Sequence, residues 1–169
     1  MEDHYGKVQI RTLRPMRVAC HRAVSKTPEE DAHAFLRKWV AERLAKGARS
    51  PRIFGFDVDV SEQDRGAGLR GYEVWATVPA SVKPSEGVVI RKFRGGLFAV
   101  MRITDPFTDP FQVIPEGWHR LMRWVEDSDG YECFHSLCLE ESVGGKGAFS
   151  EYLDLHMPVI EVTGKARAK

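Results

Sequence analysis

A carboxylate within an apolar strand is the feature of this sequence best suited to chemistry. The predicted strand 136–142 reads Ser-Leu-Cys-Leu-Glu-Glu-Ser. Because side chains alternate along a strand, Leu137 and Leu139 share one face, while Cys138 and Glu140 share the other. If the leucines pack on a helix, Glu140 points away from that helix and into the interior. The ordinary alternative is a solvated glutamate on an edge strand, since glutamate is seldom buried without a partner.

A carboxylate in such a place has two chemical uses. When ionised, it attracts a cation by about 4 kcal/mol at about 4 Å if the effective dielectric constant is about 20, against about 1 kcal/mol in water. In an apolar site its affinity for protons rises, which suits a general acid or base near neutral pH. The first use predicts a binding site and the second a catalytic one.

Aromatic side chains that could line the same site occur on several predicted elements. Their faces would add stacking and cation–π attraction to a flat, hydrophobic cation. The candidates are Tyr72, Trp75, Phe107, Phe111, Trp118 and Tyr152. Two of them have a purely structural alternative, which is capping the sheet for Tyr72 and closing the last hairpin for Tyr152.

Other combinations of reactive residues fit known kinds of site poorly. Cys133, His135 and Cys138 would supply three metal ligands without an evident fourth, so core thiols are the better interpretation. Residues 144–147 lack the spacing and the Ser or Thr of a phosphate loop. The sequence contains no Gly-x-Ser-x-Gly nucleophile motif, so His156 is not expected to belong to a Ser-His-Asp triad. We therefore expect no metal and no cofactor.

The composition excludes several classes of protein. The 169 residues are 43% hydrophobic and 29% charged, which is enough to bury a core. The net charge is +1 with Lys and Arg spread throughout, so no basic face for nucleic acid is evident, and the basic tail 165–169 is predicted to be solvated. Three cysteines without a secretory segment predict reduced thiols in a cytoplasm. No apolar run is long enough to cross a membrane.

An internal repeat with a period of about 80 residues supplies the elements that must position Glu140. Residues 8–22 align with residues 88–102. The residues that recur are Ile10, Arg11, Arg14, Ala19 and Arg22, matched by Ile90, Arg91, Arg94, Ala99 and Arg102. In each copy two short β-rich runs flank a tight connection and are predicted to form a hairpin.

A helix and two further strands follow each predicted hairpin. Thr27 is a predicted N-cap ahead of Pro28, and apolar residues at helical spacing continue until Gly47. The second helix is predicted to begin after Pro115 and to present Trp118 on its apolar stripe. The remaining strands are predicted at residues 53–60, 72–79, 134–143 and 152–161, with hairpin loops at 61–68 and 144–147.

The predicted fold class is α+β, in one domain over residues 1–169. It consists of two pseudo-symmetric β-β-α-β-β halves, about 6–80 and 87–162, separated by a linker at 80–87. Each half is an antiparallel sheet with one main helix on one face, which leaves the other face uncovered. The two uncovered faces are predicted to meet about a pseudo-twofold axis, with a ligand cleft between the halves.

Several motifs, in their order and spacing, resemble the GyrI-like small-molecule-binding domain family, which is related to the effector-binding domains of AraC-type and multidrug-responsive MerR-type regulators. The resemblance covers about residues 6–162. The motifs are Tyr-Glu-Val-Trp-Ala-Thr-Val-Pro at 72–79, Gly-Gly-Leu-Phe-Ala-Val at 95–100, Trp118 with Leu121 and Trp124, Gly-Tyr-Glu at 130–132, Cys-Leu-Glu at 138–140, and Leu-Asp-Leu-His-Met-Pro-Val at 153–159.

The resemblance implies a stand-alone member that binds hydrophobic, planar or cationic small molecules. It puts Glu140 at the floor of the cleft, with Cys138 beside it and Trp118 lining it, while Phe98 stands where a tyrosine is common. No helix-turn-helix precedes the first strand, so we expect no direct DNA binding. One alternative is a hydrolase that adds water to cyclopropane-containing DNA-alkylating natural products, with Glu140 as general base. A second is a protein-binding module like a gyrase inhibitor.

Overall fold

The structure, a computed structural model, describes residues 4–135, 137–145 and 149–164. The predictions for Ser136, for the loop residues Lys146 and Gly147 and for the basic tail 165–169 lie outside these residues. No helix in the described part of the chain is long and apolar enough to cross a membrane.

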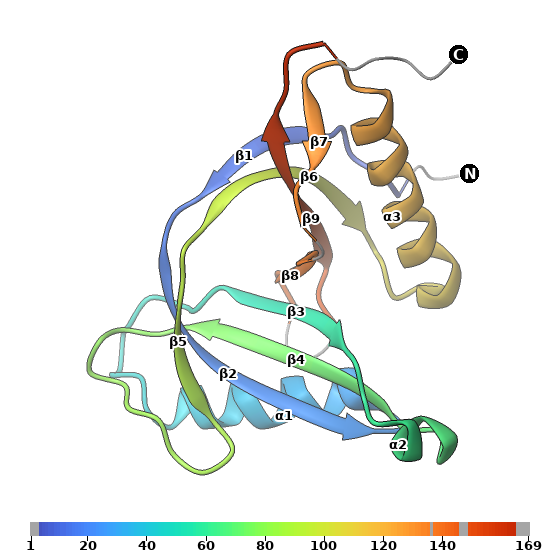
Figure 1. Ribbon diagram of the computed structural model, residues 1–169. Helices are drawn as coiled ribbons and strands as arrows, with labels where there is room; N and C mark the ends of the chain where they lie inside the picture. The colour runs from blue at the N-terminus through green and yellow to red at the C-terminus, as the bar shows by residue number, and fades with distance from the viewer. Residues whose placement is uncertain (1–3, 136, 146–148, 165–169) are drawn as a thin grey trace.

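Each half has the predicted order of strands and helix (Figure 1), so the α+β class and the repeat are confirmed. The first half contains β1 (Gln9–Leu13), β2 (Met16–Ser25), α1 (Pro28–Ala41), β3 (Ile53–Val58), the short α2 (Glu62–Gly66) and β4 (Arg70–Thr77). The second half contains β5 (Val89–Phe93), β6 (Gly96–Thr104), α3 (Pro110–Asp127), the short β7 (Tyr131–Cys133), β8 (Leu139–Val143) and β9 (Tyr152–Glu161).

The helix boundaries differ from the sequence prediction in ways that local chemistry explains. α1 begins at Pro28 as predicted, with acidic residues in its first turn, but Thr27 makes no side-chain capping bond and the helix ends at Ala41, before Gly47. α3 begins at Pro110, not after Pro115, because a proline at the first helical position is the stronger start signal. Pro115 is exposed and lies inside α3, past the first turn, where its ring removes one backbone hydrogen bond of the helix.

Two segments predicted as loop or strand also differ. Part of the predicted loop 61–68 forms α2, because the Ser61 hydroxyl accepts a hydrogen bond from the Asp64 backbone N–H at 3.1 Å and caps the helix. The predicted strand 134–143 is interrupted. The backbone N–H of Leu137 donates to Nδ1 of His135 at 3.0 Å, a local bond that holds this segment out of the sheet until β8 begins.

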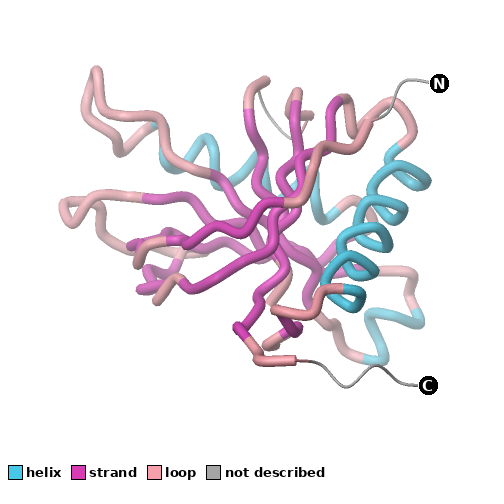
Figure 2. The backbone as a smooth tube through the Cα atoms, turned by 90° about the horizontal axis from the view of Figure 1, so that it is seen from above, coloured by secondary structure: helices cyan, strands magenta, loops and turns pink. Residues whose placement is uncertain are grey.

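The strands form one nine-stranded antiparallel sheet in the order β1-β6-β9-β8-β3-β4-β2-β5, with β7 added on β9. Exchanging the two halves gives the same order in reverse, which places a pseudo-twofold axis between β8 and β3. The sheet curls, and α1 and α3 lie outside the curl, each against its own half (Figure 1). Viewed from above, the strands gather at the centre of the molecule (Figure 2).

The two predicted hairpins are wrong. β1 pairs with β6 and β5 pairs with β2, so the first strand of each half joins the other half. The connection from β1 to β2 and the connection from β5 to β6 are in contact, because a Cβ on Gly95 would lie 2.1 Å from the carbonyl oxygen of Leu13. Gly95 also has a φ of 75°, which favours glycine. Alternation identifies a strand, but it does not say which strand is its partner, so a short connection alone was misleading.

The apolar core has three parts. α1 packs on the first half around Leu36 and Val74, and α3 packs on the second half around Leu121 and Leu155. The third part lies inside the curl, on the opposite face of the sheet, and includes Val18, Cys20, Phe54, Trp75, Phe98 and Leu139. The two faces predicted to meet are therefore buried against each other, but side chains fill the space between them.

Candidate functional site

Glu140 lies in β8 on the face of the sheet that the helices cover. Its direct partner in β9 is Leu155, which packs against α3, whereas the neighbouring Leu139 packs inside the curl. The expectation that Leu139 would pack on a helix and direct Glu140 away from it is therefore wrong. Alternation separates the two faces of a strand, but the pairing of β8 between β9 and β3 decides which face the helices cover.

Two neutral side chains hold the Glu140 carboxylate. The Tyr72 hydroxyl of β4 donates to Oε2 at 2.9 Å, and the Trp118 indole N–H of α3 donates to Oε1 at 3.1 Å. Tyr72 is buried, whereas Trp118 and Glu140 are half-buried. One donor comes from each half of the repeat, so the carboxylate joins the two halves on their helical face.

Gly55 of β3 gives Tyr72 the space to reach Glu140. A Cβ on Gly55 would lie 2.3 Å from the Tyr72 hydroxyl oxygen and 2.5 Å from a ring carbon. Gly55 is also the direct partner of Glu140 across β3 and β8. The phenol ring therefore crosses β3 over the glycine. Sequence reasoning missed this role, although a glycine inside an apolar strand is a signal of close approach.

Gly55 and Glu140 are equivalent positions of the repeat. Glu73 in β4 corresponds to Asp154 in β9, because each is the direct partner of the matching arginine of the repeat. Carrying this correspondence to the next strands makes Gly55 of β3 the counterpart of Glu140 of β8. The two counterparts also pair with each other, so they lie at the pseudo-twofold axis.

Burial raises the pKa of Glu140 above its ordinary value of 4.5. The hydrogen bonds from Trp118 and Tyr72 lower this pKa, and the charges of Asp57 and Glu29 raise it, but burial is the largest effect. Burial and the neighbouring carboxylate raise the pKa of Tyr72 well above 10, so its hydroxyl keeps its proton. The arrangement can therefore bind a cation at the carboxylate or accept a proton there.

The other interior carboxylates of the central strands have arginine partners. These pairs are Glu73 with Arg22 and Arg91, Asp154 with Arg102, and Glu141 with Arg52. Among the residues that the structure describes, the Glu140 carboxylate differs from them because its partners are neutral.

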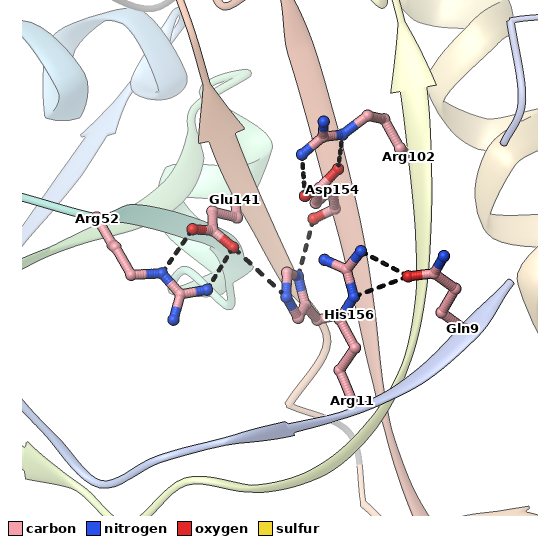
Figure 3. A network of polar contacts seen from close by, with 7 residues as sticks. All are labelled: Gln9, Arg11, Arg52, Arg102, Glu141, Asp154 and His156. Atoms are coloured by element: carbon pink, nitrogen blue, oxygen red, sulfur yellow. Dashed lines mark hydrogen bonds and ion pairs between the residues drawn. The ribbon is translucent and has the colours of Figure 1, made fainter. Parts of the chain in front are cut away.

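The opposite face of β8 carries a polar network that sequence reasoning missed (Figure 3). Glu141 accepts two hydrogen bonds from Arg52, at 2.7 and 2.8 Å, and its Oε2 lies 3.5 Å from Nε2 of buried His156. Arg52 immediately precedes β3, so this pair connects the halves on the face opposite Glu140. The sequence signal for this network was the tandem Glu140-Glu141, because side chains alternate along a strand and the two carboxylates must lie on opposite faces of the sheet.

Of the other predicted site residues, the structure brings Cys138 close to Glu140. Cys138 packs at the edge of the α3 cluster. Burial, with smaller contributions from Cys133 and the Glu140 charge, raises the pKa of the Cys138 thiol to about 11. The thiol is therefore protonated and unreactive at neutral pH.

The remaining aromatic candidates lie elsewhere. Trp75 packs inside the curl, on the face opposite Tyr72. Tyr152 points to that same inner face, with the guanidinium of Arg102 4.9 Å from its ring centroid. Phe107 packs edge to face on Phe149, and Phe111 is 90% exposed. These residues are not gathered around Glu140 because the paired strands and the start of α3 direct them elsewhere.

The cysteine and histidine cluster after β7 is engaged locally. The Cys133 thiol contacts the His135 carbonyl oxygen at 3.5 Å, and His135 Nδ1 accepts the Leu137 backbone N–H. Across the described residues, no group of three His, Cys, Asp or Glu side chains is placed to hold a metal ion.

Solved structures of low sequence identity share this fold. The EcmrR C-terminal domain is 16% identical, with a TM-score of 0.65 over 92% of this chain and 98% of that domain. SAV2435 bound to tetraphenylphosphonium is 9% identical, with a TM-score of 0.52 over 92% of this chain and 94% of that one. A hydrolase from Listeria innocua is 13% identical, with a TM-score of 0.53 over 91% and 92%.

The chain spans 59% of the longer EcmrR chain seen in a complex with DNA. Comparison with curated protein sequences gave no significant match. The family Cass2, described as integron-associated effector binding protein, matches residues 9–159, which include both halves and every residue around Glu140. The chain therefore belongs to the Cass2 family of integron-associated effector binding proteins, and the predicted GyrI-like resemblance is confirmed.

Proposed function

We propose that this protein binds a hydrophobic, planar organic cation at Glu140. The observation that carries the proposal is the contrast among the interior carboxylates, three of which have arginine partners while Glu140 has neutral ones in the described structure. A charge that is partly removed from water and has no counter-ion costs free energy. A ligand cation supplies the counter-ion, with an attraction of about 4 kcal/mol at about 4 Å for an effective dielectric constant of about 20.

The carboxylate keeps free acceptor positions and has an aromatic neighbour. A carboxylate offers about four acceptor positions, and the hydrogen bonds from Tyr72 and Trp118 use two of them. The half-buried Trp118 indole stands beside the carboxylate, and aromatic faces attract cations within about 6 Å. The related fold of SAV2435, which holds the hydrophobic cation tetraphenylphosphonium, supports an organic cation as the ligand.

A fluorescence titration with the planar cationic dye ethidium tests the proposal. Glu140→Gln keeps the shape of the side chain and removes its charge, so we expect the affinity to fall by about 10- to 100-fold, at about 1.4 kcal/mol for each factor of ten. Glu132→Gln, at an exposed position of β7, is the matched control and should bind like the wild type. Equal affinity in the two variants would refute a carboxylate that faces the ligand.

A hydrolase role is the second candidate, favoured by the raised pKa of Glu140. Glu140 would take a proton from water while the water oxygen bonds to a cyclopropane carbon of the substrate. The opening C–C bond sends its electron pair to a conjugated carbonyl oxygen, which then takes up a proton. Incubation with a cyclopropane-containing alkylator and mass spectrometry for a water adduct measures this activity. If the wild type forms no more water adduct than Glu140→Gln does, the hydrolase role is refuted and only the binding role remains.

A further inference from the structure

A groove of about 440 Å³ runs along α1 beside the Glu140 site. It is lined by α1, by the segment that leads into β3 and by the end of β8, with Arg37, Val40, Leu44, Ile53 and Ser142 among the lining residues. Ser142 lies two residues after Glu140 in β8, on the same face of the strand. The groove therefore begins about 7 Å along the sheet from Glu140, at about 3.4 Å per residue.

Arg37 is the charged side chain of this lining. Its Nε is buried and has no hydrogen-bond partner among the described residues, and burial lowers the pKa of the guanidinium. A buried donor without an acceptor costs about 1–3 kcal/mol. A ligand that accepts this hydrogen bond would remove the cost.

His33 lies one turn before Arg37 on the same face of α1. It is 5% exposed, its Nδ1 has no partner among the described residues, and its ring centroid lies 6.1 Å from that of Tyr72. Glu29, one further turn back, is engaged by Arg70. Unsatisfied polar atoms therefore follow α1 from the Tyr72 ring to the groove.

We propose that the groove is a second subsite of the Glu140 site, in which Arg37 binds the carboxylate of a zwitterionic effector. The inference rests on the proposed binding of a cation at Glu140, and it adds an anionic group to the ligand. The guanidinium fork matches a carboxylate in two parallel hydrogen bonds. Apolar Val40 and Leu44 follow Arg37 along the chain and line the groove beyond it, where an apolar part of the ligand would lie. Opposite charges at Glu140 and Arg37 fix the orientation of the ligand.

Rhodamine B and its ethyl ester are matched probes, because both carry the same planar cation and only rhodamine B has a free carboxylate. We expect the wild type to bind rhodamine B more tightly than the ester. Arg37→Met should weaken rhodamine B about 10-fold and leave the ester unchanged. Lys38→Met removes the same charge at an exposed position of α1 and should change neither dye. Glu140→Gln should weaken both.

Thermal unfolding of each variant separates a binding role for Arg37 from a structural one. Arg37→Met removes an unpartnered buried N–H, so its unfolding temperature should equal or exceed that of the wild type. A lower unfolding temperature of Arg37→Met, or an equal effect of this substitution on the two dyes, would overturn the second subsite. In that case, weaker binding of both dyes by Glu140→Gln would still support the cation site. If the wild type binds neither dye, the proposed function fails together with the subsite.

Discussion

Replacing Gly55 with alanine should disrupt the site without removing any polar group from it. The new Cβ would lie 2.3 Å from the Tyr72 hydroxyl oxygen and 2.5 and 2.6 Å from two ring carbons. Atoms do not approach so closely, so the ring must shift. Tyr72 is only 4% exposed and packs in the α1 cluster, so it has no open space to enter. The 2.9 Å hydrogen bond to Glu140 would therefore be broken.

The loss of stability follows from two effects. Overpacking of a well-packed interior costs about 1–3 kcal/mol. Losing a hydrogen bond to a charged group costs about 1.5–3 kcal/mol. Because the two effects overlap, we expect the free energy of unfolding to fall by about 3 kcal/mol, which lowers the unfolding temperature of a chain of this size by about 6–12 °C.

Thermal unfolding followed by circular dichroism measures this shift. Gly130→Ala is the control, because a Cβ there would meet nothing within 4 Å, and it should unfold like the wild type. Adding Gly55→Ala to a Tyr72→Leu variant should cost less than about 1 kcal/mol, since the ring that the methyl group meets is gone. An unfolding temperature for Gly55→Ala equal to that of Gly130→Ala would show that the phenol does not cross β3 over the glycine.

Three further predictions concern ionisable groups that are buried or half-buried. Glu140→Gln should raise the free energy of unfolding at pH 7, because the folded-state pKa of Glu140 is raised and the ionised form is disfavoured in the fold. Below pH 4.5, the ordinary pKa of a glutamate, this gain should vanish, and urea unfolding at pH 4 and pH 7 measures the difference. Burial lowers the pKa of His33 from 6.5 to about 4, so His33 should contribute a loss of about 1.4 kcal/mol of stability for each pH unit within that range as the pH falls. In a pH series of urea titrations, the difference in stability between the wild type and His33→Gln should show that slope, and a difference that does not change with pH would contradict the prediction. Glu73→Gln should destabilise the fold by about 1–3 kcal/mol, since Glu73 is 2% exposed and accepts hydrogen bonds from Arg22, Arg91 and Trp75. Chemical denaturation measures this loss, with Glu132→Gln as the control.

The order of elements could be predicted from the sequence because it depends on local patterns. The recurrence of Arg22 as Arg102 was a sound sign of the repeat, since each pairs with an acidic residue of the next strand in the sheet. The exchange of β1 and β5 could not be predicted in the same way, because it depends on pairing between segments far apart in the chain.

The surroundings of Glu140 were predictable only in part. A carboxylate in an apolar strand identified the residue, but the face it occupies depends on the pairing of β8 with β3 and β9. Trp75 could have been separated from the site by sequence reasoning alone, because Tyr72 and Trp75 are an odd number of residues apart in one strand and must face opposite ways. The role of Gly55 depends on a ring from a neighbouring strand, which no local pattern shows.

The exchange of β1 and β5 between the halves also gives the sheet the symmetry of a dimer. A sheet order that reads the same in both directions is what two identical chains with swapped arms would build around a true twofold axis. In such a homodimer the residues on the axis would be identical, so a glutamate there would face a second glutamate and be repelled by it. Two copies with different sequences in one polypeptide are free of that restriction. Gly55 and Glu140 occupy these two positions, so the difference between the two halves allows one carboxylate to stand alone at the axis.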